Sequence, residues 1–223
     1  AGGCRFWAYQ SHQAMLGDAA RLAEGMSYKN AMAGLPLGGA KAVLRRRPDG
    51  NFDRAALFRA FGRAVEALHG RYLTAEDVGT SVADMELVAA ETRHLAGLPP
   101  RDGRPGGDPS PWTAQGVFVA MRHAAERNLG KPLKDCTVAI QGVGHVGEAL
   151  ARLLHAEDAR LIVADVDRVA LNRVVVATGA TATSVDHVLT ANADILAPCA
   201  LGGVLNASTI GVFSVEHGPG LFG

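Results

Sequence analysis

Two lysines, Lys29 and Lys41, stand in the segment "YKNAMAGLPLGGAK", where most other residues are small or apolar. Of the 22 basic residues in the chain only 4 are lysines and 18 are arginines, so lysine is the exception here. A buried lysine can lose its proton and act as a base, whereas arginine keeps its charge. The occurrence of two such lysines favours a catalytic role. Either lysine alone would fit the other interpretation, a lysine whose apolar stem covers the edge of a core.

The strongest local pattern lies in the second half of the chain. The run "TVAIQ" is typical of a buried strand, and "GVGHVG" follows it, which gives Gly142, Gly144 and Gly147 the spacing G-x-G-x-x-G. A helical pattern and a second strand, "RLIVAD", come next. In that context the glycines let the backbone approach a pyrophosphate at a helix N-terminus, so the pattern predicts a dinucleotide site. A glycine-rich turn in some other α/β unit is the weaker alternative.

Asp165, at the end of that second strand, bears on which dinucleotide is bound. A carboxylate there accepts hydrogen bonds from both ribose hydroxyls of NAD. It would repel the 2′-phosphate of NADP by about 4 kcal/mol, for unit charges ~4 Å apart at an effective dielectric constant of ~20. We therefore expect NAD, with a preference that the nearby Arg168 weakens.

Asp77, in "TAEDVGT", is expected at a strand end just before Gly79, where a side chain can face a cleft. Aspartate is also common as a cap in turns, which is the other interpretation. An aspartate and two lysines beside a nicotinamide suggest chemistry at a carbon that bears nitrogen or oxygen.

An alternation of helical and strand patterns must position these residues. Four helices are expected to start at caps, and the second and fourth of them are expected to close at Gly70 and Gly130. The caps are Ser11, Asp53, Ser81 and Thr113, and the expected strands are 41–44, 71–75, 137–141 and 160–165. The Pro- and Gly-rich segment "GLPPRDGRPGGDPSP" is the clearest boundary in the chain.

Composition excludes several classes of function. The net charge is zero and no basic stripe occurs, so neither nucleic acid nor a membrane is expected as a partner. The three cysteines form no C-x-x-C pair, which favours a reduced, cytoplasmic setting. The eight histidines show no ligand spacing, so no metal is expected.

Six segments together resemble the amino-acid dehydrogenases that act on glutamate, leucine, phenylalanine and valine, with the leucine enzymes the most similar. The resemblance extends from Gly2 to about Ile210. The segments are "GGCRFWAY", "GMSYKNAMAGLPLGGAK", "GRYLTAEDVGTSVADME", "GDPSPWTAQG", "QGVGHVG" and "ADILAPCALGGVLN". Trp112 and Gln115 depart from the family's pattern.

The resemblance implies a role for each site residue. Lys29 would bind the substrate α-carboxylate, Lys41 would activate water and polarise the reacting carbon, and Asp77 would shuttle protons to and from the amino nitrogen. Burial and a second ammonium nearby would both favour proton loss from Lys41. Gly2 and Ala75 would contact the substrate. The cofactor residues implied are Thr113, Gly142, Gly144, His145, Val146, Gly147, Asp165, Cys199 and Ala200.

The reaction implied is reversible, NAD-dependent oxidative deamination of an L-amino acid to the 2-oxo acid and ammonia. Ala1 stands where the glutamate enzymes carry a lysine, and Ala75 matches the small pocket residue of the aliphatic enzymes, so leucine, valine or isoleucine is the expected substrate. A glutamate or phenylalanine enzyme, or a non-catalytic nucleotide-binding remnant, stays open as the alternative.

The fold class expected is α/β, with a partial substrate domain over 1–107 and a partial Rossmann-type, doubly wound dinucleotide-binding domain over 108–210. The segment 211–223 matches nothing in the family and is interpreted as an atypical tail. Compared with the family, the chain looks truncated at both ends. A homo-oligomer is expected for the full-length protein.

Overall fold

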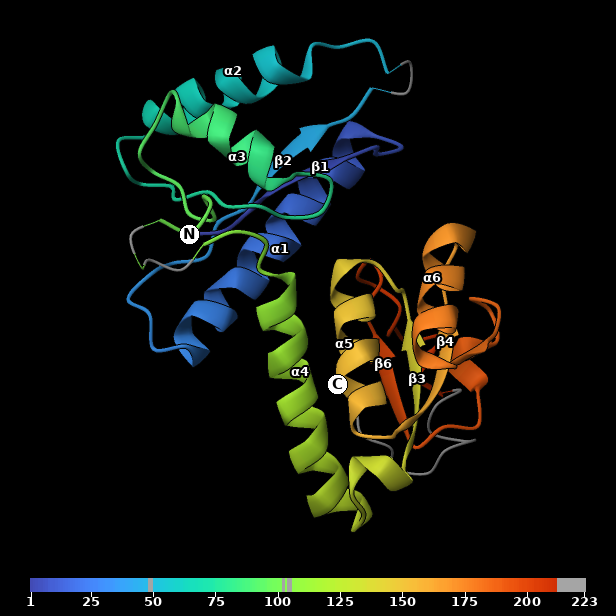
Figure 1. Cartoon of the computed structure of the whole chain (residues 1–223). Helices are drawn as coiled ribbons and strands as arrows, with labels where there is room; N and C mark the ends of the chain where they lie inside the picture. Colours follow the sequence, from blue (N-terminus) through green and yellow to red (C-terminus); the bar gives the residue numbers. More distant parts are fainter. Residues whose placement is uncertain (48–49, 102, 104–105, 212–223) are drawn as a thin grey trace. The chain divides into compact units, whose positions relative to one another are not determined.

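The computed structural model describes residues 1–47, 50–101, 103 and 106–211. The tail predicted over 211–223 therefore lies outside the described residues, apart from Gly211. The chain divides into two compact units, Ala1–Pro109 and Ser110–Gly223, and the division falls within the Pro- and Gly-rich segment 97–111. Figure 1 shows the elements of each unit coloured along the sequence.

The first unit combines one small parallel sheet with three helices. Its elements are β1 (Cys4–Trp7), α1 (His12–Met32), β2 (Ala42–Arg45), α2 (Arg54–Glu66) and α3 (Val82–Ala89). Strands β1 and β2 pair in parallel, with Cys4 opposite Ala42 and Trp7 opposite Arg45. Because parallel strands cannot be joined by a tight turn, the chain between them forms the long helix α1.

A buried tyrosine fastens the start of both strands. The hydroxyl of Tyr72 accepts a hydrogen bond from the Ala42 N–H (3.1 Å) and lies 2.8 Å from the carbonyl oxygen of Gly2 and 3.1 Å from that of Gly3. Burial raises the pKa of Tyr72 to about 12, so the hydroxyl keeps its proton and remains a donor. The Tyr72 side chain thus joins the backbone just before β1 to the first residue of β2.

The core of the first unit lies where β1 meets α2 and α3. Phe6 of β1 makes edge-to-face contacts with Phe52 and Phe58, with ring centroids 5.3 and 5.9 Å apart. Arg54 lies over the rings of Phe6 and Phe58 and bonds Asp84 through two nitrogens, at 2.8 and 2.7 Å. The cluster holds both helices against the sheet.

The second unit contains a four-stranded parallel sheet in the order β5-β4-β3-β6. Its regular elements are α4 (Ser110–Ala124), β3 (Thr137–Gln141), α5 (His145–Ala156), β4 (Arg160–Ala164), α6 (Arg168–Thr178), β5 (Thr181–Ala182) and β6 (Ile195–Pro198). Short helical turns occupy Ala125–Leu129, Leu133–Asp135 and Val188–Thr190. Chain order runs outward from β3 to β4 and β5, then reverses to β6, so the topological switch point lies between β3 and β6. This confirms the predicted Rossmann-type α/β class.

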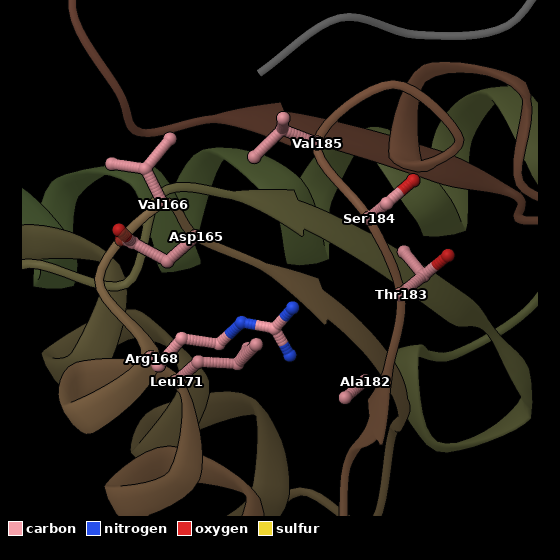
Figure 2. Close-up of a pocket in the computed structure, with 8 residues that line it drawn as sticks. All are labelled: Asp165, Val166, Arg168, Leu171, Ala182, Thr183, Ser184 and Val185. Carbon is pink, nitrogen blue, oxygen red and sulfur yellow. The ribbon is translucent and has the colours of Figure 1, made fainter.

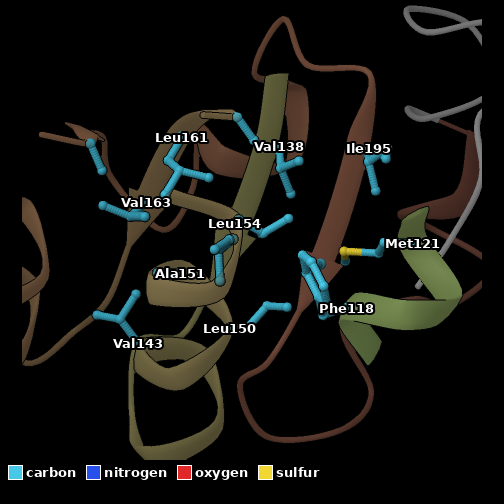
Figure 3. Packing of buried hydrophobic residues seen from close by; sticks show 14 of the residues in the cluster. Phe118, Met121, Val138, Val143, Leu150, Ala151, Leu154, Leu161, Val163 and Ile195 are labelled. Atoms are coloured by element: carbon cyan, nitrogen blue, oxygen red, sulfur yellow. The ribbon is translucent and has the colours of Figure 1, made fainter. Parts of the chain in front are cut away.

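Successive residues of β3 point to opposite faces of this sheet, as the period of a strand requires. Val138 and Ile140 belong to the larger apolar cluster, which contains side chains from α4, α5 and α6. Ala139 belongs to a smaller cluster on the other face, with Val188 and Leu196. Figure 3 shows side chains of α4, α5 and the strands meeting in the larger cluster. The sheet is covered on both faces, which parallel sheets need.

Most element predictions are confirmed, and the exceptions have local causes. Ser11, Asp53 and Ser81 cap α1, α2 and α3 through their side-chain oxygens. The prediction that Thr113 caps a helix is wrong, because α4 begins at Ser110 and Thr113 lies within it.

Two further predictions in the first unit need correction. Helix α2 ends at Glu66 with Ala67 as its C-cap, and the turn residues 67–70 that follow include His69 with a φ of +49°, so Gly70 does not close the helix. Residues 71–75 form only single bridges instead of a strand: Thr74 pairs with Leu95, and the following Glu76 pairs with Cys4. The segment still runs along β1, because Gly2 N–H bonds the Leu73 carbonyl at 3.0 Å.

Replacing Tyr72 by phenylalanine tests whether its hydroxyl holds the strand starts. We expect Tyr72→Phe to lower the free energy of unfolding by about 1–3 kcal/mol, because buried backbone groups lose a partner. Tyr28→Phe is the matched control, since the Tyr28 hydroxyl bonds Glu24 on an exposed helix face. Urea unfolding of both variants measures the difference. Equal midpoints for Tyr72→Phe and Tyr28→Phe would contradict the assignment.

Candidate functional site

The first unit brings Lys41 and Asp77 into direct contact. The ammonium nitrogen of Lys41 lies 2.9 Å from Oδ2 of Asp77, and the two side chains are 6% and 23% exposed. Lys41 directly precedes β2, and Asp77 lies in the turn before α3. A nearly buried lysine beside a carboxylate is an arrangement suited to proton transfer.

Contacts with α1 hold the glycine-rich segment that leads to Lys41. Asn30 donates to the Gly38 carbonyl oxygen at 3.2 Å, and the Gly39 N–H donates to Ser27 Oγ at 3.1 Å. A Cβ on Gly39 would overlap the Ala23 carbonyl oxygen, so only glycine lets the segment lie this close to the helix. This close packing explains why one of the small residues that precede Lys41 is a glycine.

Asp77 is fixed by its own backbone. Its N–H donates to Thr80 Oγ1 at 2.9 Å, and that hydroxyl lies 2.7 Å from the Asp77 carbonyl oxygen and 3.2 Å from that of Cys4. A Cβ on Gly3 would lie 3.0 Å from the Cβ of Asp77, so β1 passes close to the aspartate. The turn therefore places the Asp77 carboxylate next to the start of β1.

Sequence reasoning missed a second ion pair at this site. Arg5 of β1 bonds Asp77 Oδ2 through Nε at 3.0 Å and Asp18 Oδ2 through Nη1 at 2.9 Å. Asp18 also accepts from the Tyr9 hydroxyl at 2.6 Å and pairs with Arg21. The signal available in the sequence was an aspartate inside the apolar stripe of α1, at a position that the structure buries.

The electrostatics of the pair of aspartates follow from these contacts. Burial raises the pKa of Asp77, but the hydrogen bond and charge of Lys41, followed by those of Arg5, outweigh it and hold the pKa below its usual value of 3.8. Burial likewise raises the pKa of Asp18, and Tyr9, Arg5 and Arg21 lower it overall. Both carboxylates are therefore ionised at neutral pH.

The predicted substrate residues lie in different surroundings. Gly2 is buried, and a Cβ there would overlap the Ala40 carbonyl oxygen, so its backbone packs against the segment before Lys41. Ala75 is half-buried, and its carbonyl oxygen accepts from the Cys4 N–H at 2.8 Å. Lys29 lies in the last turn of α1 and is exposed. Their roles toward a substrate stay predictions.

In the second unit the three glycines form the turn from β3 to α5. Gly142 has a φ of +89°, and a Cβ on Gly147 would overlap the Gly142 carbonyl oxygen. These two glycines are needed for the turn and for packing α5 against it. No atom lies within 4 Å of a Cβ built on Gly144, so the space there is open. Gly144 caps α5 without a side-chain hydrogen bond.

Cys199 and Ala200 lie against this turn. A Cβ on Gly142 would come within 2.7 Å of the Ala200 nitrogen, and one on Gly147 within 3.3 Å of the Cys199 Cβ. Cys199 follows β6 and its N–H bonds the Gln141 carbonyl oxygen at the end of β3, at 2.7 Å. Burial raises the pKa of Cys199 to about 11, so the thiol stays protonated and is a poor nucleophile.

Asp165 follows β4 and is bonded to the glycine-rich turn. Its Oδ2 accepts from the Val143 N–H at 2.6 Å, and its Oδ1 accepts from the Asp167 N–H at 2.8 Å. The carboxylate thus joins the ends of β3 and β4, which sequence reasoning did not foresee. Each oxygen keeps a further lone pair for a ligand hydroxyl.

A pocket of about 450 Å³ opens beside Asp165. Figure 2 shows the Arg168 side chain extending from α6 toward the segment that carries Ala182 and Thr183. The lining residues are Asp165, Val166, Arg168, Leu171, Ala182, Thr183, Ser184 and Val185. The pocket lies at the carboxyl ends of β4 and β5, the edge at which α/β sheets bind ligands.

The remaining predicted cofactor residues lie on two helices. His145 is exposed and Val146 is half-buried, both in the first turn of α5 next to Gly144. Thr113 is exposed in the first turns of α4, a helix that packs against α5. Their contacts with a cofactor stay predictions.

No helix in the described part of the chain is long and apolar enough to cross a membrane. Among the same residues, no group of three or more His, Cys, Asp or Glu side chains is placed to hold a metal ion.

Two family models match the chain. Residues 1–94 match the dimerisation domain of the Glu/Leu/Phe/Val dehydrogenases, and residues 108–169 match the Glutamate/Leucine/Phenylalanine/Valine dehydrogenase model. Among curated proteins, the leucine dehydrogenase of Geobacillus stearothermophilus is 48% identical over 210 residues, which cover 94% of this chain and 57% of that protein. The valine dehydrogenase of Streptomyces coelicolor is 45% identical over 219 residues, or 96% of this chain and 60% of that protein.

Solved structures show the same similarity. The L-tryptophan dehydrogenase of Nostoc punctiforme matches with a TM-score of 0.64 and 37% identity over 95% of this chain and 59% of its own. The hetero-hexameric glutamate dehydrogenase of Thermus thermophilus matches with a TM-score of 0.70 at 21% identity, over 95% of this chain and 56% of its own, which shows the fold alone. The chain thus spans somewhat more than half the length of these relatives.

Acid should weaken the first unit through Asp18. Its lowered pKa means that the ion pair stabilises the fold fully above pH 3.8, and that this contribution is lost as the pH falls through the folded-state value. We expect Asp18→Asn to cost about 3 kcal/mol at neutral pH, because it leaves Arg5 buried with one carboxylate fewer, and much less in acid.

Urea unfolding between neutral pH and the acid limit measures this dependence. Asp186→Asn is the control, since Asp186 is exposed in the second unit. A cost of Asp18→Asn that stayed constant with pH would contradict the role of its charge.

Proposed function

The chain belongs to the Glu/Leu/Phe/Val dehydrogenase family, and from this premise we propose that it takes part in NAD-dependent oxidative deamination of an aliphatic L-amino acid. The products would be the 2-oxo acid and ammonia, and the reaction would be reversible. The observation that carries the proposal is the 2.9 Å contact between the nearly buried Lys41 and Asp77. Two groups that exchange protons are what amine oxidation and imine hydrolysis require.

The first unit supplies the proton chemistry in this proposal. Lys29 binds the α-carboxylate of the substrate through its charge. Asp77 takes a proton from the substrate ammonium, which frees the nitrogen lone pair. Lys41 activates the water that adds to the imine carbon and returns the proton when ammonia leaves. Because Lys41 is 6% exposed, bulk water has little access to this step.

The second unit fits a dinucleotide. Gly144 leaves open space beside an α5 N-terminus that has no side-chain cap, which suits the approach of a pyrophosphate. Asp165 keeps lone pairs for ribose hydroxyls, and the pocket beside it has room for the adenosine part. The bound nicotinamide would supply the hydride acceptor. The residues proposed to hold the cofactor are Thr113, Gly142, Gly144, His145, Val146, Gly147, Asp165, Cys199 and Ala200.

The choice of NAD over NADP rests on Asp165. Its carboxylate would repel a 2′-phosphate, while Arg168 in the same pocket reduces that penalty. The preference is therefore for NAD but not absolute.

An aliphatic substrate and a homo-oligomer complete the proposal. Ala1 and Ala75 supply no cation for a second carboxylate, so a buried glutamate side chain would remain unpaired. The similarity to leucine and valine dehydrogenases favours the same class. Residues 1–94 match a domain named for dimerisation, which supports self-association.

A panel of amino acids tests the proposed function. We expect leucine, valine and isoleucine to reduce NAD with kcat/KM on the order of 100-fold above glutamate, because a second carboxylate would be buried without a partner. Tryptophan and phenylalanine complete the panel, and each substrate is assayed with NAD and NADP by the absorbance of the reduced cofactor. Glutamate as the best substrate, or equal use of NADP, would contradict the proposal.

Lys41→Arg separates proton chemistry from charge. We expect it to abolish turnover while cofactor binding persists, because arginine keeps its proton under working conditions. Lys134→Arg, an exposed lysine in the second unit, is the control and should leave kcat unchanged. Steady-state kinetics and binding of NADH by fluorescence measure the two effects. A kcat for Lys41→Arg close to that of the wild type would refute the role of Lys41.

A further inference from the structure

Arg5 lies between two buried or half-buried carboxylates. Its Nε is 3.0 Å from Asp77 Oδ2 and its Nη1 is 2.9 Å from Asp18 Oδ2, and the Arg5 side chain is 12% exposed. The guanidinium is planar and rigid, so two bonds from different nitrogens fix the direction of both partners. The proton chemistry proposed for Lys41 does not by itself account for this bridge.

The two cations at Asp77 bond the same oxygen. Lys41 Nζ lies 2.9 Å and Arg5 Nε 3.0 Å from Oδ2. Among the described residues, none donates a hydrogen bond to Oδ1 of Asp77. The carboxylate therefore has one oxygen that the protein holds and one that is left for a ligand.

Arg5 is itself fixed from α1. Asp18 is 9% exposed and accepts from Arg5, from the Tyr9 hydroxyl at 2.6 Å and from Arg21 on the outer face of the helix. The part-buried donors Arg5 and Tyr9 both bond Oδ2 and fix this carboxylate, whereas the ion pair with the 68% exposed Arg21 adds little to its orientation. Because Asp18 is held in this way, Arg5 cannot turn away from Asp77 without leaving a buried charge unpaired.

We propose that Arg5 is a positioning residue that orients Asp77 through Oδ2, so that Oδ1 is the atom that exchanges a proton with the substrate nitrogen. This inference rests on the proposed function. In the step, one N–H bond of the substrate ammonium breaks and its electron pair stays on nitrogen. An O–H bond forms at Oδ1, and nothing is oxidised or reduced.

Arg5 also sets how firmly Asp77 holds that proton. Its positive charge, added to that of Lys41, disfavours protonation, so a proton taken up at Oδ1 is readily returned. The other titratable groups that face Asp77 are Cys4 and Tyr72, and burial raises the pKa of each to about 12. Both stay neutral in the working range of pH and do not compete.

The test compares Arg5→Gln and Arg5→Lys with Arg21→Gln. Arg5→Gln removes the charge and both ionic bonds, whereas Arg5→Lys keeps a charge that cannot reach both carboxylates in the same geometry. Arg21→Gln changes a 68% exposed side chain that touches Asp18 but not Asp77. Two readouts are used: carboxyl carbon-13 NMR of aspartate-labelled protein, with the Asp77 signal assigned by Asp77→Asn, and the pH profile of kcat and KM.

In the wild type we expect the Asp77 signal to stay that of a carboxylate down to acid unfolding. In Arg5→Gln the pKa of Asp77 should rise, kcat should fall on the order of 100-fold and KM should change little, because a misplaced reacting group affects the chemical step. For Arg5→Lys, kcat and the pKa of Asp77 should lie between the values of Arg5→Gln and the wild type. Arg21→Gln should match the wild type in both.

Three outcomes would overturn the proposal. One is an unchanged titration of Asp77 in Arg5→Gln, and another is the same loss of kcat in Arg21→Gln. The third is an effect confined to KM. If Arg5→Gln does not fold, Arg5→Lys decides by the same two readouts. A wild type that oxidises no amino acid would refute the proposed function, while the NMR titration would still decide whether Arg5 sets the state of Asp77.

Discussion

The contact between Lys41 and Asp77 is the constraint on which the first unit depends. A nearly buried ammonium is stable only beside a charge of opposite sign, and the aspartate needs its own fixed position to serve as that charge. The parallel strands, the Tyr72 hydroxyl and the close packing of the glycine-rich segment on α1 all bring the two side chains to 2.9 Å. Arg5 and Asp18 extend the same network to β1 and α1. The fold and the proposed chemistry therefore share their polar contacts.

The candidate site of the second unit depends on exposed backbone, whereas that of the first unit depends on buried charge. The order of its strands places the ends of β3 and β6 side by side, and the glycine-rich turn leaves β3 at that edge. Gly142 and Gly147 are explained by the turn itself, whereas Gly144 opens toward empty space. Asp165 both holds the turn, through the Val143 N–H, and lines the pocket beside it. A substitution there would alter the turn as well as any contact with ribose.

The sequence predicted what depends on local order and missed what depends on long-range pairing. Three helix caps and the strand–turn–helix–strand unit around Gly142 were predictable, because capping and glycine spacing act within a few residues. The bridge from Arg5 to Asp77 joins residues 72 apart in the chain, and no local pattern indicates it. Residues 71–75 have the composition of a strand but form single bridges, because tertiary pairing decides whether such a run becomes a ladder.

The most direct test of the account is transfer of the hydrogen on the substrate α-carbon. The protein is incubated with NAD and leucine that carries deuterium at that carbon, and the mass of the recovered cofactor is measured by mass spectrometry. The account predicts that the reduced cofactor gains one deuterium with the wild type, and that Asp77→Asn transfers almost none although it should still bind the cofactor. Reduced cofactor without deuterium would contradict hydride transfer from the α-carbon of an amino acid. Full transfer in Asp77→Asn would contradict the role of Asp77 in the proton chemistry.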